Sequence, residues 1–403
     1  MEVFSGSTAG VWLAKAEPEP ARNGIEIRPD PAEQEARRIL SDVFRCNNLV
    51  VLAGLGTSLC LRSIADGTSL APTMAALWQR VRQSHEVADD PPWNELLALV
   101  RHVAGDENLE SLLSRCRLAE QFLVDDELTK VKAFIALAEA EIVAAVDFLR
   151  DGQPLAEHGE FLRRAARRSN RKLRTKVFTT NYDRCFEEAA RQGRFVVIDG
   201  FSYTVPATFD SVYFTYDIVH RERDSDTQDF IPNVFQLYKL HGSIDWERNE
   251  ATNEILKNEK PTSPLLIYPR STKYELAFAQ PYLEMMSALQ AALREPNTGL
   301  LVIGFGFNDT HLAEPLLSAI RSNLGLKVAV VSPNLAPWPG PRGGPGEAQN
   351  NPHLRRIRDL IRGGDARLGL VNATFEDIIQ YIPDVVAETD LEKHIDRVRR
   401  LET

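Results

Sequence analysis

Short apolar runs that end in polar or glycine-rich turns are the feature that most restricts the fold of this chain. Four such runs end near residues 53, 179, 240 and 303. Continuously apolar segments without a polar face are typical of strands in a parallel sheet, which are covered on both sides. Because parallel strands present their carboxyl ends at one edge, the four following turns are expected to form a single ligand-binding edge.

Helical segments alternate with these runs, as expected for a parallel sheet with crossover helices. The predicted helices span residues 32–44, 183–191, 276–294, 309–323, 353–362 and 374–382. The predicted strands span residues 48–53, 176–179, 195–198, 234–237, 265–268, 300–303 and 326–331. The sequence therefore predicts an α/β fold with a Rossmann-like parallel sheet flanked by helices.

Strand patterns vanish between residues 63 and 169, where apolar residues recur at helical spacing, so this segment is predicted to be an α-helical insertion. The first 30 residues combine Glu-Pro pairs with little apolar periodicity, which predicts a flexible arm or an oligomerisation extension, with the fold starting after it. The predicted parts are an arm at 1–30, a ligand-binding domain at 31–62 and 170–384, a helical insertion at 63–169 and a C-terminal helix at 385–403. A Pro- and Gly-rich loop is expected at 333–352.

The overall charge and the cysteines exclude several classes of protein. A formal net charge of -10 disfavours broad attraction to nucleic acids or anionic membranes, and we predict no direct nucleic-acid binding. The basic run at 163–174 is interpreted as a solvated helix face. The four cysteines are scattered without a CxxC pair, so neither a zinc ribbon nor a disulfide framework is predicted. No apolar run approaches the roughly 18 residues of a membrane span, and a cytoplasmic location is expected.

The turns carry residues that could bind a ligand. Gly54, Gly56, Thr57 and Ser58 follow the first strand, where glycines allow close backbone approach to a diphosphate and free amides at a helix start favour negative charge. The third glycine of the dinucleotide-binding GxGxxG pattern is absent, and Leu59 stands in its place. A plain glycine turn remains the alternative.

Two further turns supply groups that can act in proton transfer or orient a substrate. Asn181 and Asp183 place an amide and a carboxylate after the second strand, with helix capping as the alternative role. His241, followed by Gly242, places an imidazole after an apolar run, where a satisfied core histidine is the alternative.

Taken together and in this order, the motifs resemble the sirtuin family, which carries a glycine-containing first loop, a TQNID-like strand end and a histidine-glycine pair. The later strings GFGFND at 304–309 and VSPN at 331–334 look like the nucleotide-contacting loops of sirtuin-like prokaryotic proteins. The resemblance covers residues 35–62 and 170–382. It departs from protein deacetylases, which normally bear a four-cysteine zinc module that this chain cannot supply, and the segment after Ser58 lacks their PDFR-like text.

This arrangement is similar to sirtuin-like NAD hydrolases of prokaryotic antiviral defence, including the type paired with a HerA-like ATPase. The resemblance implies a catalytic pair, Asn181 and His241, with NAD as substrate and no metal. In this interpretation Asn181 orients the attacking water, His241 accepts a proton, and Asp183 binds nicotinamide or orders the loop. The implied nucleotide contacts are Gly54, Gly56, Thr57, Ser58, Gly304, Gly306 and Asn308.

The same resemblance implies a homo-oligomer, a HerA-like ATPase partner and NAD depletion during phage infection. Two other functions stay open at this point. One is an NAD-dependent protein deacylase, and the other is a catalytically silent NAD or ADP-ribose sensor. The roles of Asp309 and His311 also stay open, because both lie where a helix is expected to begin and capping explains them equally well. The choice between NAD and NADP is likewise open.

Overall fold

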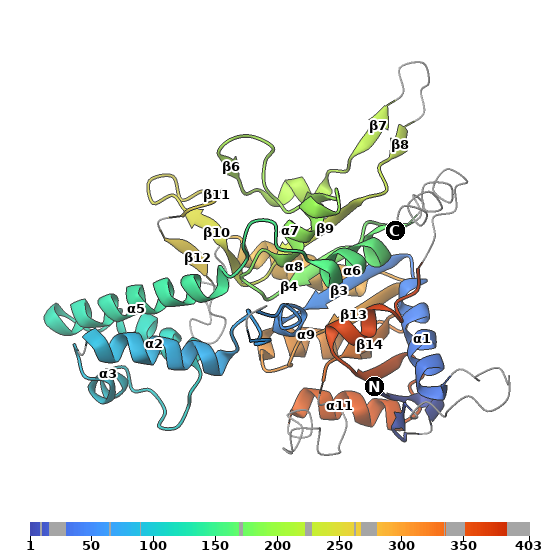
Figure 1. Ribbon diagram of the computed structural model, residues 1–403, viewed down its shortest axis with the longest axis horizontal. Coiled ribbons are helices and arrows are strands. Elements are labelled where there is room, and N and C mark those ends of the chain that lie inside the picture. The colour runs from blue at the N-terminus through green and yellow to red at the C-terminus, as the bar shows by residue number, and fades with distance from the viewer. Residues whose placement is uncertain are drawn as a thin grey trace.

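The computed structural model describes residues 1–8, 10–15, 30–63, 66–88, 90–168, 172–221, 228–261, 263–266, 280–333, 335 and 351–384. Its centre is a nine-stranded sheet with the order β2-β1-β15-β14-β13-β3-β4-β9-β5 (Figure 1). The seven strands from β15 to β5 are parallel to one another. They are β3 (Asn48–Ala53), β4 (Lys176–Thr179), β5 (Val196–Ile198), β9 (Val234–Lys239), β13 (Thr298–Ile303), β14 (Lys327–Val331) and β15 (Leu368–Asn372). The predicted α/β class with a mostly parallel sheet is confirmed.

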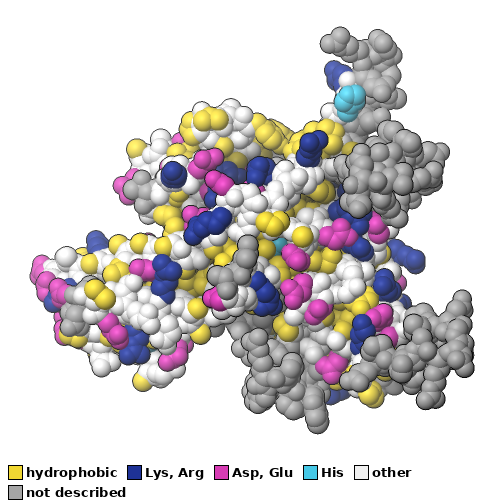
Figure 2. Space-filling model, viewed as in Figure 1, with side chains coloured by type: hydrophobic (Ala, Val, Ile, Leu, Met, Phe, Trp, Pro, Cys, Tyr) yellow, Lys and Arg dark blue, Asp and Glu magenta, His cyan; other side chains and the backbone are white. Residues whose placement is uncertain are grey.

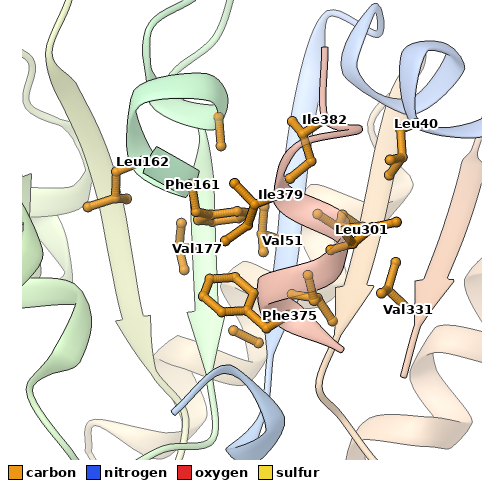
Figure 3. Packing of buried hydrophobic residues seen from close by; sticks show 14 of the residues in the cluster. Leu40, Val51, Phe161, Leu162, Val177, Leu301, Val331, Phe375, Ile379 and Ile382 are labelled. Carbon is orange, nitrogen blue, oxygen red and sulfur yellow. The ribbon is translucent and has the colours of Figure 1, made fainter. Parts of the chain in front are cut away.

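Helices cover both faces of this sheet and bury its apolar residues. One face carries α1 (Pro31–Phe44), α6 (Ala156–Ala166), α7 (Cys185–Gln192) and α12 (Phe375–Ile379). The other carries α8 (Tyr282–Arg294), α9 (Thr310–Ser322) and α11 (Pro352–Arg362). Figure 3 shows the first core, where Val51, Val177 and Leu301 of three neighbouring strands meet Phe161 and Phe375. Alternate residues of one strand enter opposite cores, as the two-residue period of a strand requires.

A separate helical arm extends from the sheet domain (Figure 1). It consists of α2 (Met74–Ala88), α3 (Trp93–Leu99), α4 (Leu109–Ala119) and α5 (Asp125–Val146), which share their own apolar core. The predicted insertion is therefore present. Its predicted end at residue 169 is wrong, because α6 packs against the sheet through Phe161, Leu162 and Ala165 instead of joining the arm.

The first residues of the chain belong to the sheet. Strand β1 (Glu2–Ser5) pairs antiparallel with β15, and β2 (Leu13–Ala14) pairs with β1. Val3 and Phe4 are fully buried. The expectation that the fold starts after residue 30 is wrong for these residues, because a four-residue strand is too short for a recognisable period. Residues 16–29 of the predicted arm lie outside the described residues.

A second, smaller sheet departs from the prediction. It is antiparallel, has the order β12-β10-β11-β6, and contains β6 (Ala207–Thr208), β10 (Gly242–Arg248), β11 (Ile255–Lys257) and β12 (Pro264–Leu266). The run at 265–268 was expected in the parallel sheet, but its described part forms β12 of this one. A hairpin of β7 (Val219–Arg221) and β8 (Gln228–Phe230) stands apart (Figure 1). The predicted C-terminal helix at 385–403 and residues 336–350 of the predicted loop lie outside the described residues.

Charges of both signs are interspersed on the face of the molecule in Figure 2. In the basic run, Arg163 and Arg164 pair with Glu160, and Arg174 pairs with Asp217. The guanidinium of Arg168 is buried and donates to backbone carbonyls, including that of Phe44. These arginines are thus engaged with the protein itself. Among the helices of the described ranges, none is sufficiently long and apolar to cross a membrane.

Candidate functional site

Two glycine-containing loops pack directly against each other at the carboxyl edge of the parallel sheet. Gly54 follows β3 and Gly304 follows the neighbouring strand β13. A Cβ atom on Gly54 would lie 2.6 Å from the carbonyl oxygen of Gly304, and one on Gly56 would lie 2.6 Å from its Cα. Gly304 also has a φ of +65°, which favours glycine. This close backbone contact explains why glycine occupies all three positions.

The amides of the first loop are used within the protein. Gly56 donates to the carbonyl of Gly304 at 2.9 Å, Thr57 to that of Gly54 at 3.0 Å, and Ser58 to that of Leu55 at 2.9 Å. The loop enters a short 3-10 turn, and the next α-helix, α2, begins only at Met74. The expectation of free amides at a helix start is therefore wrong for this loop.

Asn181 is held by the hydroxyl groups of the first loop. Its Nδ2 donates to Ser58 Oγ at 2.9 Å and to Thr57 Oγ1 at 3.3 Å, and its backbone amide donates to Thr179 Oγ1 at 3.1 Å. Asn181 as a whole residue is only 7% exposed. No described residue donates to its side-chain oxygen, Oδ1. The contacts fix the carboxamide orientation and leave its acceptor atom for a ligand.

Asp183 also belongs to this hydrogen-bond network. Its Oδ2 accepts a hydrogen bond from Ser58 Oγ at 2.7 Å, and its Oδ1 accepts one from the amide of Cys185 at 3.0 Å, the first residue of α7. Asp183 is buried. Of the two roles expected for it, these contacts match ordering of the loop. Thr57 and Ser58 likewise support Asn181 with their side chains.

His241 lies at the corner where the chain leaves the parallel sheet and enters the small antiparallel one. Strand β9 ends at Lys239 and β10 begins at Gly242. Gly242 has a φ of +81°, and a Cβ atom there would lie 2.1 Å from the carbonyl oxygen of Leu265 in β12. The glycine of the histidine-glycine pair is thus required by the turn. The His241 side chain is 7% exposed.

Asp309 is the partner of His241 and also caps a helix. Its Oδ2 lies 3.1 Å from Nε2 of His241, while its Oδ1 accepts the amide of His311 at 2.9 Å at the start of α9. Burial opposes ionisation of Asp309, but the contact with His241 and the His311 amide outweigh it and lower the pKa of the carboxyl group. Nδ1 of His241 has no hydrogen-bond partner among the described residues. The role of Asp309 in holding His241 was missed because capping explained the residue.

A buried lysine joins the two strands that carry the site. Lys239, 2% exposed, donates from Nζ to the carbonyls of Tyr182 at 3.3 Å and Asp183 at 2.5 Å, and to Glu187 Oε1 at 2.9 Å. Burial raises the pKa of Glu187 although Lys239 opposes the shift. Sequence reasoning missed this residue. A charged side chain inside the apolar run 234–240 was the available signal, because a buried charge needs partners.

The structure thus brings two groups of residues to the carboxyl edge of the parallel sheet, and Tyr182 lies between them. The first is Asn181 with its partners, and the second is His241 with Asp309. The rings of Tyr182 and His241 lie 6.3 Å apart between centroids. Gly306 and Asn308 are exposed on the loop before Asp309, where Asn308 Oδ1 accepts from Asn351 Nδ2 at 3.4 Å.

Two surface cavities among the described residues lie elsewhere. One, of about 600 Å³, is lined by residues of α8 and α9, including Gln290 and Ser318. The other, of about 450 Å³, is lined by residues including Arg184, Glu187, Asp245 and Lys257. Neither is lined by Asn181 or His241.

Comparisons with known proteins relate part of the site to a known kind of domain. Residues 175–351 match the family model described as the SIR2-like domain. This segment is similar to a SIR2-like domain. The match covers less than half of the chain and includes Asn181, His241 and Asp309, whereas the Gly54 loop lies outside it. SIR2-like domains are NAD-using domains. A search of curated proteins found no match.

Solved structures resemble the chain only loosely. One is a Sir2 variant with a deacetylated p53 peptide and 3'-O-acetyl ADP-ribose, with a TM-score of 0.31, 13% identity and coverage of 87% of this chain and 96% of that one. Another is cytosolic 5'-nucleotidase IIIB bound to cytidine, with a TM-score of 0.29, 12% identity and coverage of 87% and 91%.

All four cysteines are free thiols: Cys46, Cys60, Cys116 and Cys185. Three are buried, and Cys60 is half-buried. Burial raises the pKa of Cys60 to about 12. Over the described ranges, no three His, Cys, Asp or Glu side chains are grouped so that they could hold a metal ion.

Proposed function

We propose that this protein is an NAD glycohydrolase that cleaves NAD to nicotinamide and ADP-ribose. The observation that carries the proposal is the pairing of two oriented groups at one sheet edge of a SIR2-like domain. Asn181 is fixed through Nδ2 and offers Oδ1, while His241 is fixed through Nε2 and offers Nδ1. One atom of each side chain therefore remains for substrate or water.

The chemistry suits such a site. The nicotinamide of NAD is cationic, so the bond between its nitrogen and C1′ of the ribose breaks with the electron pair moving to nitrogen. The leaving group becomes neutral and needs no general acid. Water then bonds to C1′ and loses a proton. In the proposal Oδ1 of Asn181 orients this water, Nδ1 of His241 takes the proton, and Asp309 stabilises the resulting imidazolium.

The contacts refine the roles of the nucleotide-binding residues. Because the hydroxyls of Thr57 and Ser58 already hold Asn181, their proposed task is to orient that side chain. Gly54, Gly56, Gly304, Gly306 and Asn308 remain the proposed contacts of the nucleotide, with Gly306 and Asn308 exposed for this purpose. NAD is the substrate in this proposal, and no step in it uses a metal.

The proposed biological setting is antiphage defence by NAD depletion, in a homo-oligomer controlled by a HerA-like ATPase. Such an activity must be restrained, because unchecked hydrolysis would kill the host. The helical arm offers a route for control. Tyr182, adjacent to Asn181, packs against the arm core, as does Ile244 of β10. A partner that shifts the arm would therefore act on the residue next to the proposed catalytic amide.

The test is nicotinamide release by the purified protein from NAD, with and without acyl-lysine peptide and the candidate ATPase. We expect release that is independent of peptide and falls by at least about 100-fold in Asn181→Ala and in His241→Ala. The control is His220→Ala, an exposed histidine in β7, which should keep full activity. Release only with peptide would establish a deacylase. Binding of NAD without release under every condition would establish a sensor.

A further inference from the structure

Lys239 belongs to β9, the strand before His241, and its buried side chain contacts the loop of Asn181 after β4. It lies at the end of β9, two residues before His241, and its Nζ reaches the loop after the neighbouring strand β4. Lys239 pairs with Thr179 in the register of the two strands. Its three contacts are the carbonyls of Tyr182 and Asp183, directly after Asn181, and the carboxylate of Glu187.

An ammonium group is suited to this place. It has three donors, and the three oxygen atoms around Lys239 can accept all of them. The carbonyl of Asp183 has no other donor among the described residues, whereas that of Tyr182 also accepts the backbone amide of Ile244 in β10 at 3.3 Å. Lys239 donates to both carbonyls while Glu187 balances its charge. A charge pair serving stability alone would need only Glu187, so the two carbonyl contacts require a separate explanation.

We infer that Lys239 is a positioning residue that fixes the loop of Asn181 relative to His241. The inference rests on the proposed function and deepens it. Lys239 reaches neither Asn181 Oδ1 nor His241 Nδ1 through any described contact, so it acts through the backbone of residues 182 and 183. Ser243, the second residue of β10, supports the same carbonyl of Tyr182 with a longer contact of 3.4 Å. The loop is thus held from the His241 side by two side chains and by the backbone amide of Ile244.

The variants separate positioning from charge balance. Lys239→Met with Glu187→Gln removes the donor without leaving a buried charge. Glu187→Gln alone keeps the carbonyl contacts and removes only the charge pair. Lys176→Met is the matched control, because Lys176 is a half-buried lysine at the opposite end of the neighbouring strand β4. Lys239→Gln with Glu187→Gln, whose two amides can bond each other, serves if the methionine variant does not fold.

We expect the double variant to lose about 10-fold to 100-fold in kcat, with KM for NAD changed less than about 3-fold, since misplacement affects the reacting geometry most. Glu187→Gln and Lys176→Met should keep kcat within about 3-fold of wild type. A folded double variant with wild-type kcat would overturn the inference. So would an equal loss in Glu187→Gln, which would assign the effect to charge balance.

Amide hydrogen exchange of residues 180–184 gives a readout independent of activity. We expect faster exchange of this segment in the double variant and unchanged exchange in Lys176→Met and Glu187→Gln. If wild type releases no nicotinamide, the proposed function fails, yet the exchange result still tests whether Lys239 holds the loop. Unchanged exchange in the double variant would contradict the inference even when NAD hydrolysis is established.

Discussion

Ser58 does not contact substrate in the proposed mechanism, but its loss should affect the site directly, because it holds both Asn181 and Asp183. It is fully buried, its Oγ donates to Asp183 at 2.7 Å, and it accepts from Asn181 Nδ2 at 2.9 Å. Ser58→Ala removes one hydrogen bond to a buried carboxylate, worth about 1.5 to 3 kcal/mol, and one of the two bonds made by Asn181 Nδ2. The expected decrease in the free energy of unfolding is therefore about 2 to 4 kcal/mol.

Ser114 provides a matched control. It is a buried serine in α4 of the arm, and its hydroxyl has no hydrogen-bond partner among the described residues. Ser114→Ala should leave stability unchanged or raise it by up to about 0.5 kcal/mol, since alanine favours the helix. Urea unfolding measures both changes in the free energy of unfolding, provided that each variant keeps the wild-type dependence of this free energy on urea concentration. A Ser58→Ala variant within about 0.5 kcal/mol of wild type would refute the proposed network.

Further predictions concern the loop after β13 and the partner of His241. Gly304→Ala should lose at least about 2 kcal/mol of stability, because φ is +65° and the new Cβ would lie 2.7 Å from the Thr57 amide. Gly306→Ala, whose Cβ would meet only the Asn308 side chain at 3.4 Å, should change the unfolding free energy by less than about 0.5 kcal/mol. Asp309→Asn keeps a good helix cap but removes the charge facing His241, so kcat should fall about 10-fold to 100-fold while the variant stays folded with a measurable loss of stability at neutral pH. Because folding lowers the pKa of Asp309 below its ordinary 3.8, its stabilisation is complete above that pH and is lost as pH falls through the folded value. The stability difference between wild type and Asp309→Asn should therefore shrink in acid, and a constant difference would contradict the stabilising contacts of the ionised Asp309 carboxylate.

Much of the fold could be predicted because its strands are apolar throughout and its helices are periodic. β3, β13 and β14 are buried runs, and α9 begins at a cap that the sequence displays. Short strands were harder to recognise. β1 has four residues and pairs with β15, a strand that was not predicted, and the two residues of β2 pair with β1. Their stability comes from tertiary contacts that a local pattern does not contain.

The site was predicted as a set of residues, but its internal connections were not. Gly54, Gly56 and Gly304 were identified as turn glycines, whereas their mutual packing depends on the adjacency of β3 and β13. Asp309 contacts His241, which lies 68 positions away in the chain, and Lys239 donates to Asp183, which lies 56 positions away. Such partners follow from the strand order, which the sequence alone leaves undetermined.

The most direct test of the proposed reaction is the fate of oxygen from water during NAD turnover. The protein is incubated with NAD in water labelled with heavy oxygen, without acyl-lysine peptide, and the products are analysed by mass spectrometry. The proposed mechanism predicts nicotinamide and ADP-ribose in equal amounts, with one labelled oxygen bonded at C1′, and loss of both products in Asn181→Ala. Formation of ADP-ribose species only when acyl-lysine peptide is present, carrying the acyl group, would contradict it.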